Sequence, residues 1–408
     1  MREEPTGNSQ ELSFRLGINY WPATTAFFWW QRFNPSDVER DFGRIREAGF
    51  DSVRIFLLWE DFQPAPNRIS RDTVSRLRFV ADCGFRLGLS LIPTFFTGHM
   101  SGANWIPPWA LASGSDGSRF PIVSGGRVVA ATIRNWYTDE DIARAQELLI
   151  REIVGSLRDH PAIWAWDLGN ESSNCVQPPS PTAAVDWLER MAATIRQYDP
   201  HRPITVGLHA EDLEEDRRLG PAEAGRVCDF LSMHGYPVYA RWAEGPTDAR
   251  VLPFLALLTR WLGRREVLFE EFGAPTSPPE GEVPSPVPLL REEEASQYTD
   301  RALMALHDVG CMGAMLWCYS DYVQDLWGLP PLDRAPHERW FGLWRADGTP
   351  KAAVKTVSSW KGKKRRPPQD DFSWIDIQPD TFTERPGEHL PHLYSRFCVW
   401  WSKREGAE

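Results

Sequence analysis

Lysine is missing from most of this chain. None occurs before Lys351, so arginine carries the permanent positive side-chain charge of the first 350 residues. Enzymes that form a Schiff base need a lysine on a barrel strand or loop. The distribution therefore argues strongly against aldolase-type and pyridoxal-type chemistry.

Paired cysteines and long apolar runs are also lacking. The six cysteines form no C-x-x-C pair, and no Cys/His set has the spacing of a zinc site. Residues 1–10 are polar and acidic, without a signal-peptide pattern, and no run of about 18 apolar residues is present. We expect no metal, no cofactor and no membrane association. If Met1 is the natural start, we also expect a reducing cytoplasmic location.

Negative side-chain charge exceeds positive charge overall, and the net charge is −11. Such a balance argues against a nucleic-acid-binding surface. One basic run, at residues 361–366, opposes the trend. We interpret it as a solvated loop, because two prolines follow it and no amphipathic helix carries it.

Tryptophan, in contrast, is abundant, with 20 residues. Burial in the core is the default explanation for any single indole. As a group, indoles in loops suggest a cleft that stacks on flat apolar faces, such as those of pyranose rings. The tryptophans that we assign to loops are Trp21, Trp29, Trp30, Trp59, Trp105, Trp109, Trp136 and Trp327.

Short apolar, strand-like runs alternate with helical patterns along the chain. The predicted helices begin at typical capping residues. Asn34 with Pro35 begins one helix, Ser70 begins a second that should end at Gly84, and Thr138 begins a third. No G-x-G-x-x-G follows the first strand, which argues against a dinucleotide fold. The predicted strands span residues 14–20, 52–59, 85–95, 162–168, 203–208, 230–234, 266–271 and 312–319.

Eight strands alternating with helices predict a (β/α)8 TIM barrel. We place this barrel at residues 14–360, after an N-terminal tail at 1–13. Residues 361–408 are predicted to be a basic linker and a short C-terminal extension, with a helix at 390–401 that packs on the barrel. The long loop at residues 96–137 is rich in Gly, Pro and Trp, and loops of that length are usually functional.

Two of the predicted strands end in glutamate. The runs W-D-L-G-N-E at 166–171 and L-F-E-E-F-G at 268–273 stop at Glu171 and at the doublet Glu270-Glu271. The carboxyl ends of barrel strands converge on one face, where catalysis takes place. Two facing carboxylates are the minimal equipment for cutting a glycosidic bond.

The chemistry of that reaction assigns tasks to the neighbouring polar residues. The proton donor needs a raised pKa, which Trp164 and Trp166 would favour if they line the site. The nucleophile must stay ionised, held by a guanidinium and by hydroxyl or imidazole donors. The candidates for these supports are Arg54, His234 and Tyr236, with Asn170 for a substrate hydroxyl and Trp317 as a stacking floor.

Other polar residues have simpler explanations. Glu60 and Asp61 end the second strand and fit a solvated rim or a helix cap better than a cleft. Asp167 lies inside the fourth strand and is expected to pair with an arginine. His234 has an alternative interpretation as a satisfied core histidine. Arg54 in an apolar strand is costly to bury without a carboxylate partner, which favours a role at the site.

These motifs, taken in order, resemble clan A glycoside hydrolases, and most of all family 5, the cellulase and β-mannanase family. The resemblance covers about residues 14–360. It rests on W-D-L-G-N-E, on H-G-Y at 234–236, on E-E-F-G at 270–273 and on L-W at 316–317. V-R-I at 53–55 matches the strand-two arginine of that family. Residues 341–351 are similar to the segment after strand eight in related β-glycosidases.

The resemblance implies a role for each matching residue. Glu171 corresponds to the acid/base and Glu271 to the nucleophile, which that family places before an aromatic residue and glycine. Adjacent strand residues point to opposite faces, so we expect Glu270 to be a salt-bridge partner behind the sheet. The implied supports of substrate or nucleophile are Arg54, Asn170, His234, Tyr236, Trp317 and, with a looser match in position, His99.

The function that follows is a retaining β-glycosidase acting on β-linked oligosaccharides. β-Mannosides are favoured, and the loops after strands three and seven would wall off an exo-acting pocket. One alternative is a β-glucosidase, β-galactosidase or endo-glucanase of the same clan. Others are a non-catalytic carbohydrate-binding barrel and a metal- or phosphate-dependent barrel enzyme, although no H-E-x-x-H set or glycine-rich phosphate loop is present.

Overall fold

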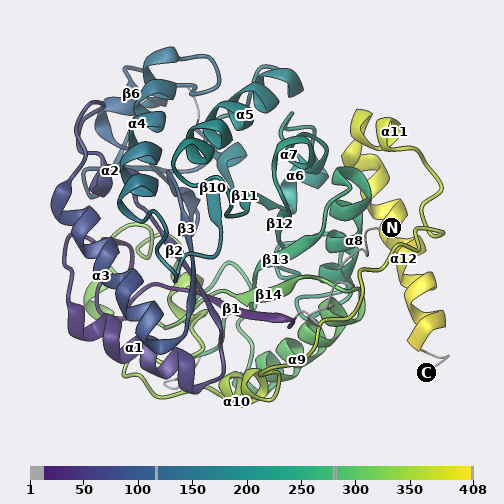
Figure 1. The fold of residues 1–408 in the computed structure, drawn as a ribbon. Helices are drawn as coiled ribbons and strands as arrows, with labels where there is room; N and C mark the ends of the chain where they lie inside the picture. Colours follow the sequence, from purple (N-terminus) through teal and green to yellow (C-terminus); the bar gives the residue numbers. More distant parts are fainter. Residues whose placement is uncertain (1–12, 115–117, 279–280, 282, 406–408) are drawn as a thin grey trace, which may run out of the picture.

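The computed structural model of the chain describes residues 13–114, 118–278, 281 and 283–405. Its centre is a closed barrel of parallel strands (Figure 1), which confirms the predicted (β/α)8 TIM fold. Strand β14 pairs with β1 and β10 pairs with β11, so the sheet has no open edge within the barrel. The barrel strands are β1 (Arg15–Asn19), β2 (Ser52–Phe56), β3 (Ser90–Thr94), β10 (Trp166–Asn170), β11 (Ile204–His209), β12 (Leu231–His234), β13 (Val267–Phe272) and β14 (Gly313–Leu316).

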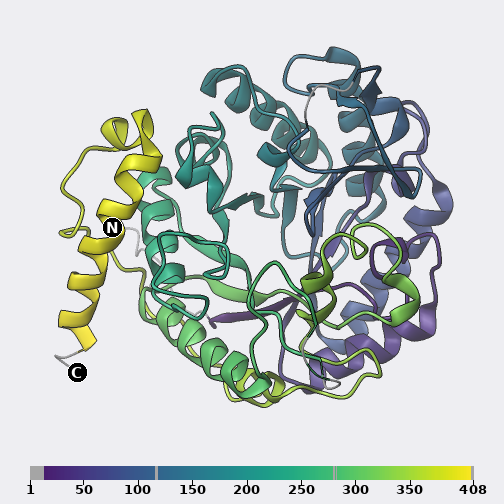
Figure 2. The same ribbon diagram turned by 180° about the vertical axis from the view of Figure 1, so that it is seen from behind.

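A helix follows each barrel strand and covers the outside of the sheet (Figures 1 and 2). The inner faces of these helices are apolar. The barrel strands are buried on both faces, as parallel sheets require. The outer helices are α1 (Pro35–Glu47), α3 (Arg71–Leu87), α4 (Glu140–Ser156), α5 (Pro181–Tyr198), α7 (Pro221–Val227), α8 (Val251–Gly263), α9 (Glu292–Asp308) and α10 (Ala352–Ser358). No described helix has the length and apolarity needed to cross a membrane.

Two predicted helix boundaries are wrong. Helix α3 does not stop at Gly84 but continues to Leu87, where Gly88 ends it with a left-handed φ of 68°. A Cβ at Gly84 would lie 3.3 Å from the Leu91 side chain, so this glycine serves close packing of the helix on β3. Helix α4 is capped by Asp139 rather than by Thr138, because the Asp139 carboxylate accepts the N–H groups of the first turn.

A separate apolar layer fills the lower end of the barrel. Its buried members come from five different strands or their approaches: Ile92, Ala165, Phe230, Leu268 and Met315. Trp164 closes this layer, stacked on Phe230 and covered by the Arg15 guanidinium 3.7 Å from its ring centroid. The polar layer that carries the site therefore lies on a packed apolar floor.

The long loop after β3 is folded into small strands rather than left irregular. It contains β4 (Gly98–Met100), β5 (Ala103–Trp105), β6 (Leu111–Ala112), β7 (Ile122–Ser124), β8 (Arg127–Val129) and β9 (Thr132–Ile133). Strand β4 pairs with the end of β10, so this excursion extends the barrel sheet beside the site. Two short helices, α2 (Trp59–Phe62) and α6 (Glu211–Glu214), follow β2 and β11.

The C-terminal extension forms α11 (Pro379–Glu384) and α12 (Pro386–Glu405), which lie against one side of the barrel near α8 (Figures 1 and 2). Helix α12 contacts α6 and α8. Tyr394 and Phe397 pack on Phe254, and the Tyr394 hydroxyl donates to Asp248 at 2.5 Å. The N-terminal tail proposed for residues 1–13 lies, except for Ser13, outside the described residues.

Candidate active site

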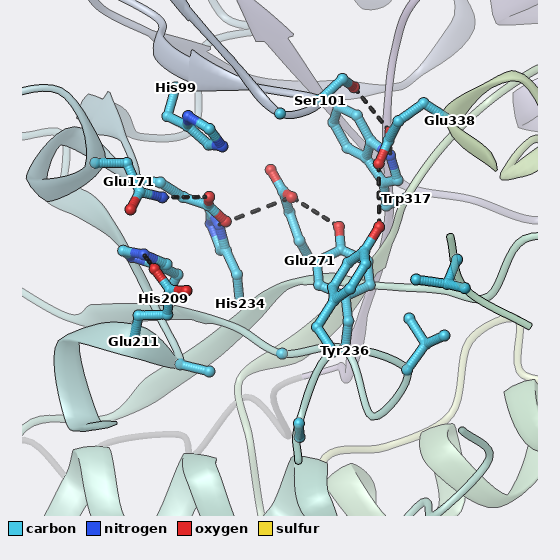
Figure 3. Close-up of a pocket in the computed structure, with 18 of the residues that line it drawn as sticks. His99, Ser101, Glu171, His209, Glu211, His234, Tyr236, Glu271, Trp317 and Glu338 are labelled. Atoms are coloured by element: carbon cyan, nitrogen blue, oxygen red, sulfur yellow. Dashed lines mark hydrogen bonds and ion pairs between the residues drawn. The ribbon is translucent and has the colours of Figure 1, made fainter. Parts of the chain in front are cut away.

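A cavity of about 790 Å³ opens at the carboxyl ends of the barrel strands (Figure 3). Both strand-end glutamates line it, together with the other predicted site residues except Arg54. Further lining comes from the loops after β3, β12 and β14, which contribute Phe120, Tyr239 and Glu338. The structure thus brings the predicted site residues together at the face where barrel enzymes carry their chemistry.

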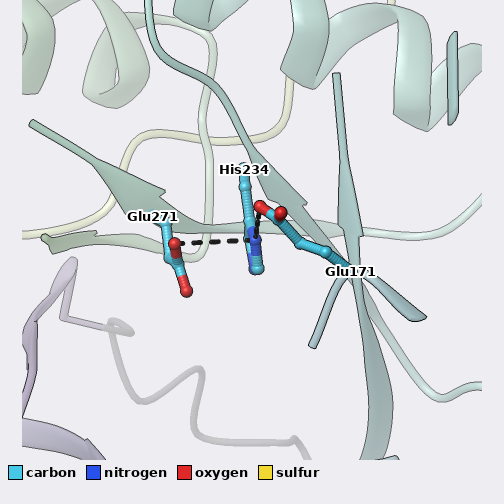
Figure 4. A group of neighbouring side chains, drawn as sticks. All are labelled: Glu171, His234 and Glu271. Carbon is cyan, nitrogen blue, oxygen red and sulfur yellow. Dashed lines mark hydrogen bonds and ion pairs between the residues drawn. The ribbon is translucent and has the colours of Figure 1, made fainter. Parts of the chain in front are cut away.

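Glu171 and Glu271 face each other across His234 (Figure 4). The His234 Nδ1 atom lies 3.0 Å from Glu171 Oε1 and 3.7 Å from Glu271 Oε2. A carboxylate oxygen from each glutamate and a ring nitrogen of His234 all lie within 4.8 Å of one another. His234 is therefore not a passive core residue but the bridge between the two acids.

A kink at the end of β10 aims Glu171 into the cavity. The pairing of β10 with β11 shifts register between Asp167 and Asn170, and Glu171 itself adopts a left-handed φ of 47°. The opposing residue must be glycine: a Cβ at Gly207 would lie 2.7 Å from the Gly169 carbonyl and 2.9 Å from Arg54 Nη2. The strand end is held because the Glu171 N–H donates to the Gly207 carbonyl at 3.0 Å.

A second bulge, in β13, turns both members of the glutamate doublet into the barrel. Pairing with β12 shifts between Phe269 and Glu271, so the strict alternation of faces is broken. The prediction that Glu270 lies behind the sheet is therefore wrong. Its carboxylate is fully buried inside, 3.5 Å from Arg54 Nε and 3.5 Å from His234 Nε2. Asn19 stabilises the bulge by donating to the Glu270 carbonyl at 3.0 Å.

Arg54 is the hub of the buried charges below the cavity. It has no solvent exposure, and its guanidinium donates to Glu271 Oε1 at 2.5 Å and to Asp167 Oδ2 at 2.6 Å. With Glu270 it is thus paired to three carboxylates. Asp167 pairs with an arginine, as predicted, and Arg54 reaches the proposed nucleophile from beneath rather than by lining the cavity.

The remaining predicted residues take distinct positions around the two glutamates. Tyr236 donates its hydroxyl to Glu271 Oε2 at 2.8 Å. Asn170 donates its amide to the His99 carbonyl at 2.5 Å, while its buried Oδ1 has no hydrogen-bond partner among the described residues. His99 contacts Asn104 through Nδ1 at 2.8 Å, and Trp317 forms part of the cavity wall.

The charges around Glu171 favour its ionised form. Burial alone would raise the pKa of this carboxyl, but the imidazoles of His209, His234 and His99 lower it to about 2. Trp164 and Trp166 were expected to raise the pKa of Glu171 by lining the site. This expectation is wrong, because neither indole lines the cavity. Trp164 belongs to the floor of the barrel, and Trp166 donates to Asp199 at 3.0 Å.

The pKa of Glu271 is shifted in the opposite direction. Its burial raises the pKa, and the charge of Glu171 raises it further, against the lowering effect of His234 and Arg54. The His234 pKa is raised to about 9, because the surrounding carboxylates outweigh the cost of burying its charge. The two acids interact closely enough that their protonation belongs to the pair.

Two functional neighbours were missed from the sequence. His209, at the end of β11, lines the cavity and binds Asp212 at 3.0 Å, and its pKa is raised to about 10 by Asp212 and Glu171 despite burial. The strand predicted at 203–208 stopped one residue short of it. Glu338, far along the loop after β14, also lines the cavity; no local pattern marks it.

The hypothesis that the tryptophans assigned to loops form a sugar-binding cleft is mostly wrong. Most of the tryptophans assigned to loops are buried and pack on one another, as in the contact of Trp29 with Trp30 at 3.9 Å between centroids. The indoles that line the cavity are instead Trp242 and Trp317. Glu60 accepts the Gly125 N–H and Asp61 accepts from Gln31, so neither lies in the cavity.

Comparisons with known proteins show that the barrel is similar to glycoside hydrolases. A family model described as "Glycosyl hydrolases family 2, TIM barrel domain" matches residues 127–325. The chain is 26% identical over 247 residues to "Mannan endo-1,4-beta-mannosidase 1" of Oryza sativa subsp. japonica, covering 52% of each chain. It is 24% identical over 208 residues to "Probable mannan endo-1,4-beta-mannosidase F" of Aspergillus flavus, covering 46% of this chain and 40% of that one. The chain spans less than two thirds of these curated relatives.

Solved structures show the same fold over more of the chain. GH5_18 from Streptomyces cattleya, in complex with Manβ1-4GlcNAc, matches with a TM-score of 0.78 and 23% identity, covering 94% of this chain and 90% of that chain. An exo-beta-1,4-mannosidase from Opitutaceae bacterium strain TAV5 matches with a TM-score of 0.71 and 24% identity, covering 86% and 60%. These findings confirm the resemblance to clan A glycoside hydrolases, most of all family 5.

Proposed function

We propose that the protein is a retaining β-glycosidase that hydrolyses β-mannosides through Glu171 and Glu271. The observation that carries this proposal is the short separation of the two carboxylates, since one oxygen of each lies within 4.8 Å of the other and of a His234 ring nitrogen. Retaining enzymes hold their carboxyl groups about 5–5.5 Å apart, whereas inverting enzymes leave about 6.5–9.5 Å for a water molecule.

In this mechanism Glu271 attacks the anomeric carbon while Glu171 protonates the departing oxygen. Arg54 and Tyr236 bind one oxygen each of the Glu271 carboxylate, which fixes its orientation and favours its charged form. Glu171 then acts as a base toward the water that releases the sugar from Glu271. Asn170 presents a carbonyl oxygen beside Glu171 that no described residue binds, suited to accept a substrate hydroxyl.

The reaction needs a proton on Glu171 and a charge on Glu271, and both acids contact the same imidazole. His234 Nδ1 lies within 3.7 Å of an oxygen of each carboxylate. We infer that this imidazole exchanges protons with the two carboxylates as their charges change during the reaction. Such a pair gives a bell-shaped pH dependence whose limbs belong to the pair.

The choice of β-mannosides draws on the mannanase relatives and on the mannoside named with the Streptomyces cattleya structure. A panel of aryl β-glycosides tests it: the mannoside should be hydrolysed fastest. Proton NMR of the first product should show the β-anomer, and an α-anomer would refute retention. Glu271→Ala should abolish turnover. If Glu271→Ala remains active and Glu270→Ala is inactive, the nucleophile is Glu270 and our assignment is reversed.

The proposal also concerns the cellular compartment in which the protein acts. We propose a reducing, cytoplasmic setting, which the six free cysteines support. Cell fractionation of the native host tests this point, and recovery of the protein outside the cell would refute it.

A further inference from the structure

Glu338 is a buried carboxylate in the cavity wall that the mechanism above does not use. Only 7% of the residue is exposed, and it lines the cavity close to Trp317. Among the described residues, the one positively chargeable group recorded beside it is His337, 3.5 Å away. A buried carboxylate without an arginine or lysine partner is costly, which suggests that its charge serves a ligand.

Neutral donors hold this carboxylate in place. Ser101 donates to Oε2 at 2.8 Å, Tyr239 donates to Oε1 at 3.2 Å, and Trp317 Nε1 lies 3.4 Å from Oε2. His337 Nε2 in turn contacts the Tyr239 hydroxyl at 2.8 Å. An ionised carboxylate offers about four acceptor sites, so these three contacts leave capacity for a further donor.

The position of Glu338 relative to the catalytic pair identifies the part of the substrate that it would meet. Glu171 must lie beside the leaving oxygen, so the aglycone occupies its side of the cavity. Figure 3 shows Glu338 and Trp317 on the other side of Glu271 from Glu171. A sugar ring stacked on Trp317, with its anomeric carbon at Glu271, extends its far hydroxyls toward Glu338.

Resting on the proposed function, we propose that Glu338 binds the glycone by accepting hydrogen bonds from hydroxyls remote from the anomeric carbon, those at C4 or C6. The donors around it keep its oxygens pointing into the cavity. The same contact closes the glycone side after one sugar ring, which favours removal of single residues from the non-reducing end.

Deoxygenated substrates test this contact directly. Take the aryl β-glycoside that the wild type hydrolyses best, and compare kcat/KM with its 4-deoxy and 6-deoxy analogues. Loss of a hydrogen bond to a charged group lowers kcat/KM by roughly 10- to 100-fold for at least one analogue. Loss below about 3-fold for both analogues overturns the inference, and this measurement needs no variant.

The variant Glu338→Gln, tested with the same substrates, shows whether the lost hydroxyl contact is made by Glu338. We expect the parent substrate to lose roughly 10-fold and the sensitive deoxy analogue to lose less, because the neutral amide oxygen of glutamine accepts a weaker hydrogen bond than the carboxylate. If Glu338 merely supports Trp317, the deoxy effect persists in full in the variant, and the inference fails. Glu60→Gln is the matched control, since Glu60 accepts a backbone N–H outside the cavity; its kinetics should match the wild type.

The two proposals fail in different ways. If the wild type cleaves none of the aryl β-glycosides, the proposed function itself is refuted. If the wild type is active and Glu338→Gln stays within about 3-fold of it on the parent substrate, only the role of Glu338 is refuted.

Discussion

Replacing Arg54 by methionine is expected to destabilise the protein in a pH-dependent way. The side chain is fully buried and pairs with three carboxylates, at 2.5 Å to Glu271, 2.6 Å to Asp167 and 3.5 Å to Glu270. Removing one partner of a buried ion pair costs about 3–5 kcal/mol. For 408 residues, with an unfolding entropy of about 2.1 cal/mol/K per residue, this corresponds to a fall in Tm of ~5 °C.

The sign of the pH effect follows from the acids that lose their cation. Burial and the charge of Glu270 already raise the pKa of Asp167 to about 6, against roughly 4 in an unfolded chain. An acid with a raised folded pKa contributes stability at low pH that is lost as the pH rises through that window. Without Arg54 the carboxylates shift further upward, so the deficit of Arg54→Met is wider at pH 8 than at pH 5.

Thermal unfolding followed by circular dichroism at both pH values measures this deficit. Arg86→Met is the control, because the Arg86–Glu39 pair is about half exposed on each side and such pairs contribute about 0–1 kcal/mol. A Tm of Arg54→Met within about 1 °C of the wild type at pH 8 would refute the reasoning. An equal deficit at pH 5 and pH 8 would refute its electrostatic part.

The other predictions concern the reacting pair and its supports. Glu171→Ala should slow hydrolysis of substrates with poor leaving groups by about 10²–10⁴-fold, yet spare dinitrophenyl glycosides; equal losses would contradict its role as proton donor. His209→Asn removes a charge that opposes the effect of burial on the Glu171 pKa, so the alkaline limb of kcat/KM should move upward between pH 4 and 9. An unchanged profile would exclude that influence. Gly207→Ala should destabilise or misfold the barrel, as judged by Tm and soluble yield, because its Cβ meets a backbone carbonyl at 2.7 Å. Zn²⁺ should inhibit reversibly by binding Glu171, His234 and Glu271, and EDTA alone should leave the activity unchanged; activation by Zn²⁺ would contradict the two-acid mechanism.

Much of this arrangement could be predicted because it follows from strand order. Apolar runs that end in Glu171 and Glu271 fix where the strands stop, and barrel closure then brings their ends together. The inward turn of Glu270 could not be predicted, because a bulge changes the face of a residue without changing the apolar pattern.

Loop residues were harder to predict for a different physical reason. Glu338 reaches the cavity from a short 3-10 helix, Pro336–Trp340, in the long segment after β14, where no barrel strand ends. Its place depends on tertiary contacts with Ser101, Tyr239 and Trp317, which come from three other parts of the chain. His209 was missed only by one position, at a strand end whose limit is set by pairing with β12.

The bulge in β13 has a consequence for how this site can change over time. Because it places Glu270 and Glu271 in one interior with Asp167, Arg54 and His234, these five side chains form a single charge set. Neutralising one member leaves another buried without its counter-ion. Substitutions in this layer should therefore show strong epistasis, with paired changes tolerated where single changes are not, and redesign of the nucleophile must treat the five positions as one unit.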